Sequence, residues 1–239
     1  MAGILIVKPR RRTFLIAALA VAVWLLHAPL LQFLAQLLIV DQPNGDYQLV
    51  CIASRNGWPA DDWCYDAAAE LFRAKPSSEI LLVQPPDNRL IELGIAPKFE
   101  AISRRELELR GVPQTSISVV RSTICGEQAA IEAIQPRLSR QPNNSAVLLC
   151  NLFYSARIRL LVDRVLNPSQ ASRVRVCGIP SQQCDATNWW KSRDGYKVFG
   201  DGWLRQLFHW CGRSDEAASC YSADDYQRKV LQSFSEDTP

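Results

Sequence analysis

The chain has 239 residues, enough for one sizeable domain or two small ones, and 48% apolar with 21% charged residues excludes a wholly disordered protein. Its 27 basic and 24 acidic side chains give a net charge of +3. Residues 1–40 hold four of the basic side chains (Lys8, Arg10, Arg11 and Arg12) and no acidic one, so residues 41–239 carry a net charge of −1. A near-neutral domain lacks the basic surface that nucleic-acid binding requires.

The N-terminal region predicts a membrane anchor. Residues 13–40 form a run of 28 residues without Asp, Glu, Lys or Arg, and about 20 apolar residues cross a hydrocarbon core. Because the basic cluster precedes this run, the positive-inside rule predicts a cytoplasmic stub at 1–12, a transmembrane helix at 13–40 and an extracytoplasmic remainder on the periplasmic side. A cleaved signal peptide, whose apolar region is shorter, and a buried soluble helix are the alternatives. We expect a single-pass protein of the cell membrane.

Export changes the interpretation of the cysteines, because thiols outside the cytoplasm tend to be oxidised. No CxxC pair occurs and His209 is the only histidine after the run, so we expect disulfides and no metal. The shortest loops would join Cys177 with Cys184 and Cys211 with Cys220. Other readings stay open: Cys51 and Cys150 lie in apolar runs typical of buried free thiols. The eight cysteines are Cys51, Cys64, Cys125, Cys150, Cys177, Cys184, Cys211 and Cys220.

Residues 41–212 alternate short apolar runs with helical stretches of 10 to 15 residues. Strands are predicted at 47–53, 79–83, 116–120, 146–150 and 174–178. Helices are predicted at 63–75, 98–110, 155–166 and 203–210, with a further one capped by Ser122 or Thr123 and ending near 139. Helices between successive strands imply right-handed crossovers. The order therefore predicts an α/β, Rossmann-like three-layer domain with a mostly parallel sheet, preceded by one transmembrane helix and followed by a polar tail at 213–239.

Candidate binding residues follow the predicted strands, because open parallel sheets bind ligands beyond the carboxyl ends of their strands. This rim is rich in Arg, hydroxyl and amide groups, and the helices behind it aim N–H groups at it, which suits an anionic or polyhydroxylated ligand. The alternative is that the same residues are ordinary caps and turns. The candidates are Ser54, Arg55, Asn56, Gly57, Ser122, Thr123, Asn151, Tyr154 and Arg157.

No familiar catalytic motif identifies an enzyme. The chain has no G-x-S-x-G elbow, GxGxxG fingerprint or P-loop. A Ser-His-Asp arrangement would depend on His209, which lies between Phe208 and Trp210. Cys125 near a helix start is either an activated thiolate or, as we expect, a disulfide or buried thiol. The aromatic-rich stretch 203–210 is typical of core or docking surface, with a sugar-binding platform as the alternative. Catalysis stays open and the cofactor is unknown.

Several motifs within residues 41–212 carry a family resemblance. A polar entry at 41–46 precedes the first strand, and Gly111-Val112-Pro113 precedes a strand that ends before Ser122-Thr123. Phe153-Tyr154-Ser155-Ala156-Arg157 follows the fourth strand, and the Trp-containing loop 189–195 precedes Trp203-Leu204-Arg205. Together with the helix at 66–74, these segments resemble the YdcF-like family of envelope proteins, which includes SanA and ElyC.

The resemblance implies one N-terminal span, a Rossmann-like domain and a role in cell-envelope or peptidoglycan-precursor metabolism. It carries over Ser122, Thr123 and Arg157, and it places Glu127 and Asp201 near the family's acidic positions. The family's glycine pair is replaced here by Ser54-Arg55-Asn56, and Tyr154 stands in place of its His.

Three hypotheses follow. In the first, the exported domain binds an anionic envelope intermediate, such as a lipid-linked glycan or phosphate; Arg157 pairs with the anion, Ser122 and Thr123 donate hydroxyl hydrogens and Asn151 orients the ligand. In the second, the protein is a catalytically inactive scaffold or interaction protein. In the third, it is a hydrolase or transferase that acts on a phosphorylated or glycan substrate.

Overall fold

The computed structural model describes residues 14, 26–40, 42, 45–52, 62–87, 89–95, 97–181 and 184–211. The predicted cytoplasmic stub, the middle of the predicted span, the candidate residues Ser54, Arg55, Asn56 and Gly57, and the polar tail lie outside these ranges.

The described chain forms a five-stranded sheet in which every neighbouring pair is parallel. Its strands are β1 (Leu49–Ile52), β2 (Glu79–Gln84), β3 (Ile117–Arg121), β4 (Ala146–Asn151) and β5 (Val174–Ile179), in the order β3-β2-β1-β4-β5. Each strand lies where an apolar run predicts it, so the Rossmann-like α/β prediction is confirmed. Because β1 is central, the strand order reverses between β1 and β4, and this switch point is where open sheets bind ligands.

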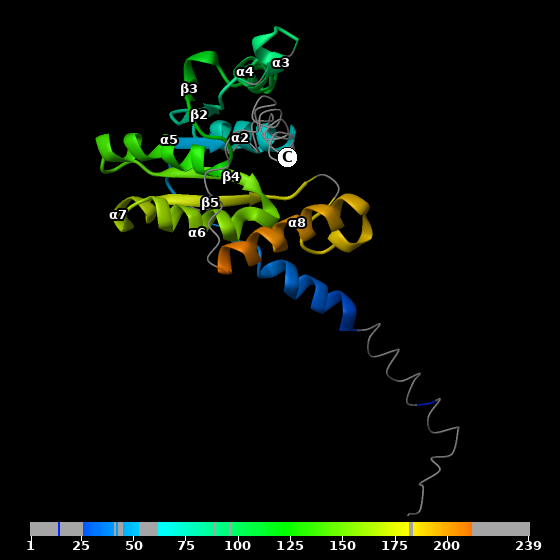
Figure 1. Ribbon diagram of the computed structural model, residues 1–239. Coiled ribbons are helices and arrows are strands. Elements are labelled where there is room, and N and C mark those ends of the chain that lie inside the picture. Colours follow the sequence, from blue (N-terminus) through cyan, green and yellow to red (C-terminus); the bar gives the residue numbers. More distant parts are fainter. Residues whose placement is uncertain are drawn as a thin grey trace, which may run out of the picture.

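Helices cover both faces of the sheet (Figure 1). The helices α2 (Asp62–Ala74) and α4 (Phe99–Leu109) pack on one face, whereas α5 (Glu127–Arg140), α6 (Ser155–Val165) and α7 (Pro168–Ala171) pack on the other. The short α3 (Arg89–Glu92) lies between β2 and α4, and α8 (Arg193–Trp210) packs outside α6. The two helix layers produce two apolar cores, one on each side of the sheet.

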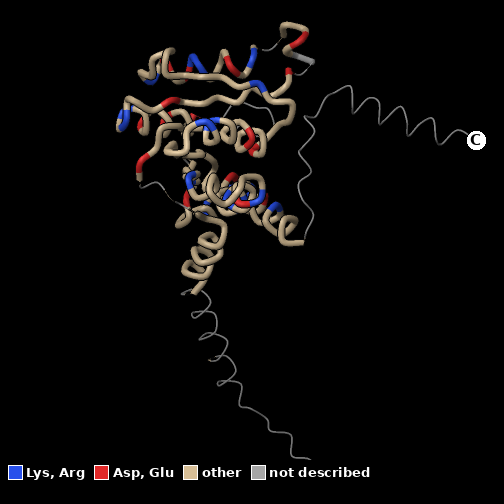
Figure 2. The backbone as a smooth tube through the Cα atoms, turned by 90° about the vertical axis from the view of Figure 1, so that its left-hand side faces the viewer, with Lys and Arg blue, Asp and Glu red and all other residues tan. Residues whose placement is uncertain are grey.

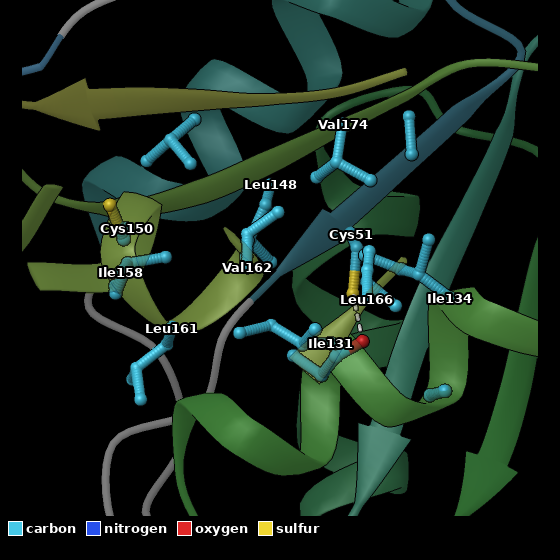
Figure 3. Packing of buried hydrophobic residues seen from close by; sticks show 14 of the residues in the cluster. Cys51, Ile131, Ile134, Leu148, Cys150, Ile158, Leu161, Val162, Leu166 and Val174 are labelled. Atoms are coloured by element: carbon cyan, nitrogen blue, oxygen red, sulfur yellow. Dashed lines mark hydrogen bonds between the residues drawn. The ribbon is translucent and has the colours of Figure 1, made fainter. Parts of the chain in front are cut away.

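Alternate residues of the central strands supply these two cores. Val50 and Ile52 of β1 face α2, whereas Leu49 and Cys51 face α5 and α6. Figure 3 shows the second core, where Cys51 lies beside Ile131 and Ile134 of α5. A strand that is covered on both faces must be apolar at every position, which is why an unbroken apolar run identified β1 and β4.

Helix starts differ from the sequence expectation in two places. The helix α5 begins at Glu127 rather than at Ser122 or Thr123, because Gly126 precedes it with φ 84°, a left-handed conformation that glycine adopts readily. Ser122 instead makes a local turn, with its Oγ accepting from the Ile124 N–H at 3.1 Å. The last helix is longer than 203–210: it begins at Arg193, where the Ser192 side chain accepts from the Gly195 N–H.

The end of the predicted span is folded onto the domain. Residues 26–36 are helical, and Ala35 and Leu38 are fully buried against Leu152, Phe153 and Trp189. The Val40 N–H donates to Ser155 Oγ at 2.9 Å, and the Ala156 N–H donates to the Leu38 carbonyl at 3.1 Å. Within the described ranges no helix combines the length and apolar character that a membrane crossing requires.

The two predicted local disulfides are wrong. Cys177, Cys184 and Cys211 are free thiols, as are Cys51, Cys64 and Cys150, while Cys125 is disulfide-bonded. The interpretation of Cys51 and Cys150 as buried thiols is confirmed. Burial raises the pKa of Cys51 to about 12 and raises that of Cys150 well above its usual value, so both thiols stay protonated and unreactive at neutral pH.

Candidate functional site at the strand switch point

A cluster of charged and polar side chains lies beyond the carboxyl end of β4. Glu127 is the first residue of α5, Tyr154 and Arg157 lie at the start of α6, and Asp201 and Arg205 come from α8. These five residues are called the switch-point cluster below. Three helices that are distant in the sequence thus deliver two carboxylates, two guanidinium groups and one phenol to the edge where a ligand site is expected.

The innermost contact of the cluster is a buried ion pair. Arg157 Nη2 lies 2.8 Å from Glu127 Oε1, and the two side chains are only 3% and 12% exposed. Glu127 is well placed, since a carboxylate at a helix N-terminus faces the positive end of the helix dipole. Arg157 is not, because its positive charge lies in the first turn of α6 and faces the same end of that dipole.

The outer part of the cluster ties α8 to α6. The Tyr154 hydroxyl donates to Asp201 Oδ2, and Arg205 Nε donates to the same carboxylate oxygen at 3.0 Å. The Arg205 guanidinium also lies 5.8 Å from the centre of the Tyr154 ring. Burial alone would lower the pKa of Arg205, but Asp201 and Glu127 outweigh it and raise the pKa. The cluster is therefore continuous and, with two charges of each sign, electrically neutral.

Glycine lets α8 approach this site closely. A Cβ atom on Gly202 would lie 2.7 Å from the Phe153 carbonyl oxygen, within the 3₁₀ turn Leu152–Tyr154 that links β4 to α6. Any larger side chain would push α8 away from α6 and separate Asp201 from Tyr154.

The described candidate residues divide into two groups. Tyr154 and Arg157 belong to the switch-point cluster, and Asn151 lies just before it, where its side chain accepts from the Phe153 N–H at 3.1 Å. Ser122 and Thr123 follow β3, which β2 and β1 separate from β4. Asn151 therefore acts as a cap. The described candidates, which we expected to line one rim together, do not share one pocket.

Ser122 lines a separate pocket of about 330 Å³ at the ends of β2 and β3. The Gln84 side chain lies in its wall and holds the start of α4, since its Oε1 accepts from the Glu100 N–H at 2.8 Å. Lys98 and Asp87 form an ion pair at 3.0 Å on the same wall. This pocket carries exposed charges of both signs, unlike the buried cluster near β4.

Sequence reasoning did not name Arg205 as a site residue. The available signal was its spacing, because an acid and a base four residues apart face each other on a helix, and Asp201 and Arg205 form such a pair. The described residues contain no group of three His, Cys, Asp or Glu side chains that could hold a metal ion. Comparison with known proteins finds no matching family model, no matching curated protein and no matching solved structure.

Proposed function

We propose that this chain is a single-pass membrane-anchored protein of the cell envelope whose extracytoplasmic Rossmann-like domain binds an anionic envelope intermediate. The basic cluster before the apolar run supports the orientation. The near-neutral domain supports a small ligand rather than a nucleic acid, and the resemblance to YdcF-like proteins supports a role in envelope or peptidoglycan-precursor metabolism. A lipid-linked glycan or phosphate would pair with the guanidinium groups of the switch-point cluster, those of Arg157 and Arg205.

The observation that carries this proposal is the buried Glu127–Arg157 pair at the strand switch point. Burying two charges costs several kcal/mol per ion, and apolar residues of similar volume commonly stabilise a fold as well or better. The position of Arg157 at the positive end of α6 adds to that cost. Because apolar residues could stabilise this position as well, a charged pair at the edge where open sheets bind ligands supports binding as the reason for its presence.

A catalytically inactive scaffold is the second candidate, and a specific observation favours it. Asn151 and Tyr154 are both engaged in internal contacts, as a cap of the Leu152–Tyr154 turn and as a donor to Asp201. Because these side chains make internal contacts, they hold α8 in place and do not bind a ligand. The outer surface of α8 is then left to contact a protein partner.

The experiment compares three forms of the detergent-extracted full chain by mass spectrometry of the small molecules that co-purify. The forms are the wild type, the double variant Glu127→Leu/Arg157→Met and the double variant Glu79→Leu/Arg137→Met. The last is a matched control, because Glu79 and Arg137 form an ion pair at 2.7 Å at the opposite, amino edge of the sheet.

Binding at the switch point predicts an anionic species with the wild type and with the control, and its loss from the Glu127/Arg157 variant. The same species on all three forms would refute the assigned site. If none of the three carries such a species, the binding proposal fails and the scaffold is favoured.

A further inference from the structure

The last turns of α8 expose a continuous apolar surface. Leu204, Leu207, Phe208 and Trp210 are 45 to 58% exposed, and their spacing places them on adjoining positions of one side of the helix. We call these four residues the α8 apolar face. Such a concentration of large exposed apolar side chains marks an interaction surface rather than scattered surface residues.

This face adjoins the helix that emerges from the predicted span. Trp203 packs in one apolar cluster with Ala35, Leu38 and Leu31. Its ring lies edge to face with that of Trp210, with 6.1 Å between the two ring centroids. The emerging helix also exposes large apolar side chains, those of Leu26, Leu30, Phe33 and Leu37. Figures 1 and 2 show that helix 26–36 leaves the domain at the end where α8 lies, and that α4 is at the opposite end.

The length of the uncharged run indicates what covers this surface. The Trp189 indole N–H donates to the Leu31 carbonyl at 3.4 Å and holds this part of the run against the domain. Residues 13–30 remain for a crossing, and these 18 residues are within the roughly 17 to 25 that a transmembrane helix needs. A crossing by residues 13–30 would leave no linker before the folded domain, so the domain would have no free length over which to move away from the bilayer.

We propose that the α8 apolar face lies in the interfacial region of the bilayer that carries the anchor, so that α8 seats the domain on the membrane as an amphipathic helix. This inference rests on the membrane anchor of the proposed function. Trp side chains favour the interface between headgroups and acyl chains. Asp201 and Arg205 border this face, next to Leu204 and Phe208, and their charges are engaged with Tyr154 and with each other. The switch-point cluster is thereby held close to the lipid surface, which fits a lipid-linked ligand.

The test is photo-crosslinking of the full chain in nanodiscs made of equal parts phosphatidylcholine and phosphatidylglycerol. Benzoyl-phenylalanine replaces Phe208 in one form and Leu109 in the other. Leu109 is the matched control, since it is more exposed, at 71%, and is the last residue of α4, the helix that lies at the end of the domain away from the emerging helix (Figure 1). In a third form benzoyl-phenylalanine replaces Leu207, so that the result for α8 does not depend on Phe208 alone.

The inference predicts lipid adducts at Phe208 and Leu207 in about tenfold or greater excess over Leu109. Equal lipid yields at all three positions, or no lipid adduct at α8 while the chain remains in the disc, would overturn the seating of α8 and leave the anchor intact. Crosslinks at Phe208 to a second copy of the chain would overturn it in favour of self-association. Absence of the chain from the discs would overturn the anchor itself, and the seating with it.

Discussion

The two ends of the sheet's carboxyl edge, near β4 and near β3, hold their charged side chains in different environments. Near β4, charged side chains are buried and paired with one another, as in Glu127–Arg157. Near β3, the charged side chains around Ser122 are exposed and line an open pocket. A residue type in a rim position therefore does not define a site. Ser122 and Arg157 both follow strands, yet only Arg157 carries a buried charge and its energetic cost.

Removal of one buried charge should distinguish the two ends of the edge most strongly. Glu127→Leu leaves the Arg157 guanidinium buried without its carboxylate, and we expect a loss of about 3–5 kcal/mol in the free energy of unfolding. Glu79→Leu is the control, because its ion pair is about one-third exposed and is worth roughly 1 kcal/mol or less. Denaturant unfolding of the full chain in detergent measures both. Equal losses for the two variants would remove the distinction.

Tyr154→Phe tests the outer part of the switch-point cluster. The change deletes a hydroxyl that donates to the Asp201 carboxylate, and hydrogen bonds to charged groups contribute about 1.5–3 kcal/mol. The same unfolding measurement should show this loss, whereas Tyr196→Phe, at an exposed tyrosine, should stay within about 0.5 kcal/mol of the wild type. An unchanged free energy of unfolding for Tyr154→Phe would mean that the other partners of Asp201, Arg205 among them, satisfy its carboxylate.

At the β3 end the largest expected effect comes from Gln84, which is buried although it lines the pocket. Gln84→Met keeps the volume but removes the acceptor for the Glu100 N–H, and a lost helix cap costs about 0.5–2 kcal/mol. We expect α4 to become less protected at its first turn, which amide hydrogen exchange resolves. Unchanged exchange at Glu100 would contradict the capping role.

The smallest effect belongs to the exposed pair at the same pocket. Lys98→Met removes the partner of Asp87, and exposed pairs of this kind contribute about 0–1 kcal/mol. Its unfolding midpoint should match that of the wild type within error. A loss as large as that of Glu127→Leu would show that the β3 end also depends on its charges.

The sequence predicts the strands well, because a parallel strand covered on both faces must be apolar throughout. It predicts helix boundaries less well. The start of α5 depends on the left-handed conformation of Gly126, which competes with the capping signal of Ser122. The short α7 was missed although Asn167 and Pro168 form a cap followed by a first-turn proline.

The candidate site was predictable only in part. Arg157 and Tyr154 were found because they follow β4, but their partners Glu127 and Asp201 come from other helices. Such pairing is a property of the packing of α5, α6 and α8, and no local pattern encodes it. For the same reason the burial of Ala35 and Leu38 against Trp189 was not expected, since an apolar residue in a long apolar run carries no mark of its partner.

We propose that the Glu127–Arg157 pair is present for binding and not for folding. The most direct test is the free energy of unfolding of the double variant Glu127→Leu/Arg157→Met, measured on the full chain in the same detergent as the wild type. We expect a free energy of unfolding within about 1 kcal/mol of the wild type, or above it, because apolar replacements remove the desolvation costs of both charges. A loss of about 3 kcal/mol or more, as large as that of Glu127→Leu alone, would contradict the claim and make the pair a structural element of the fold.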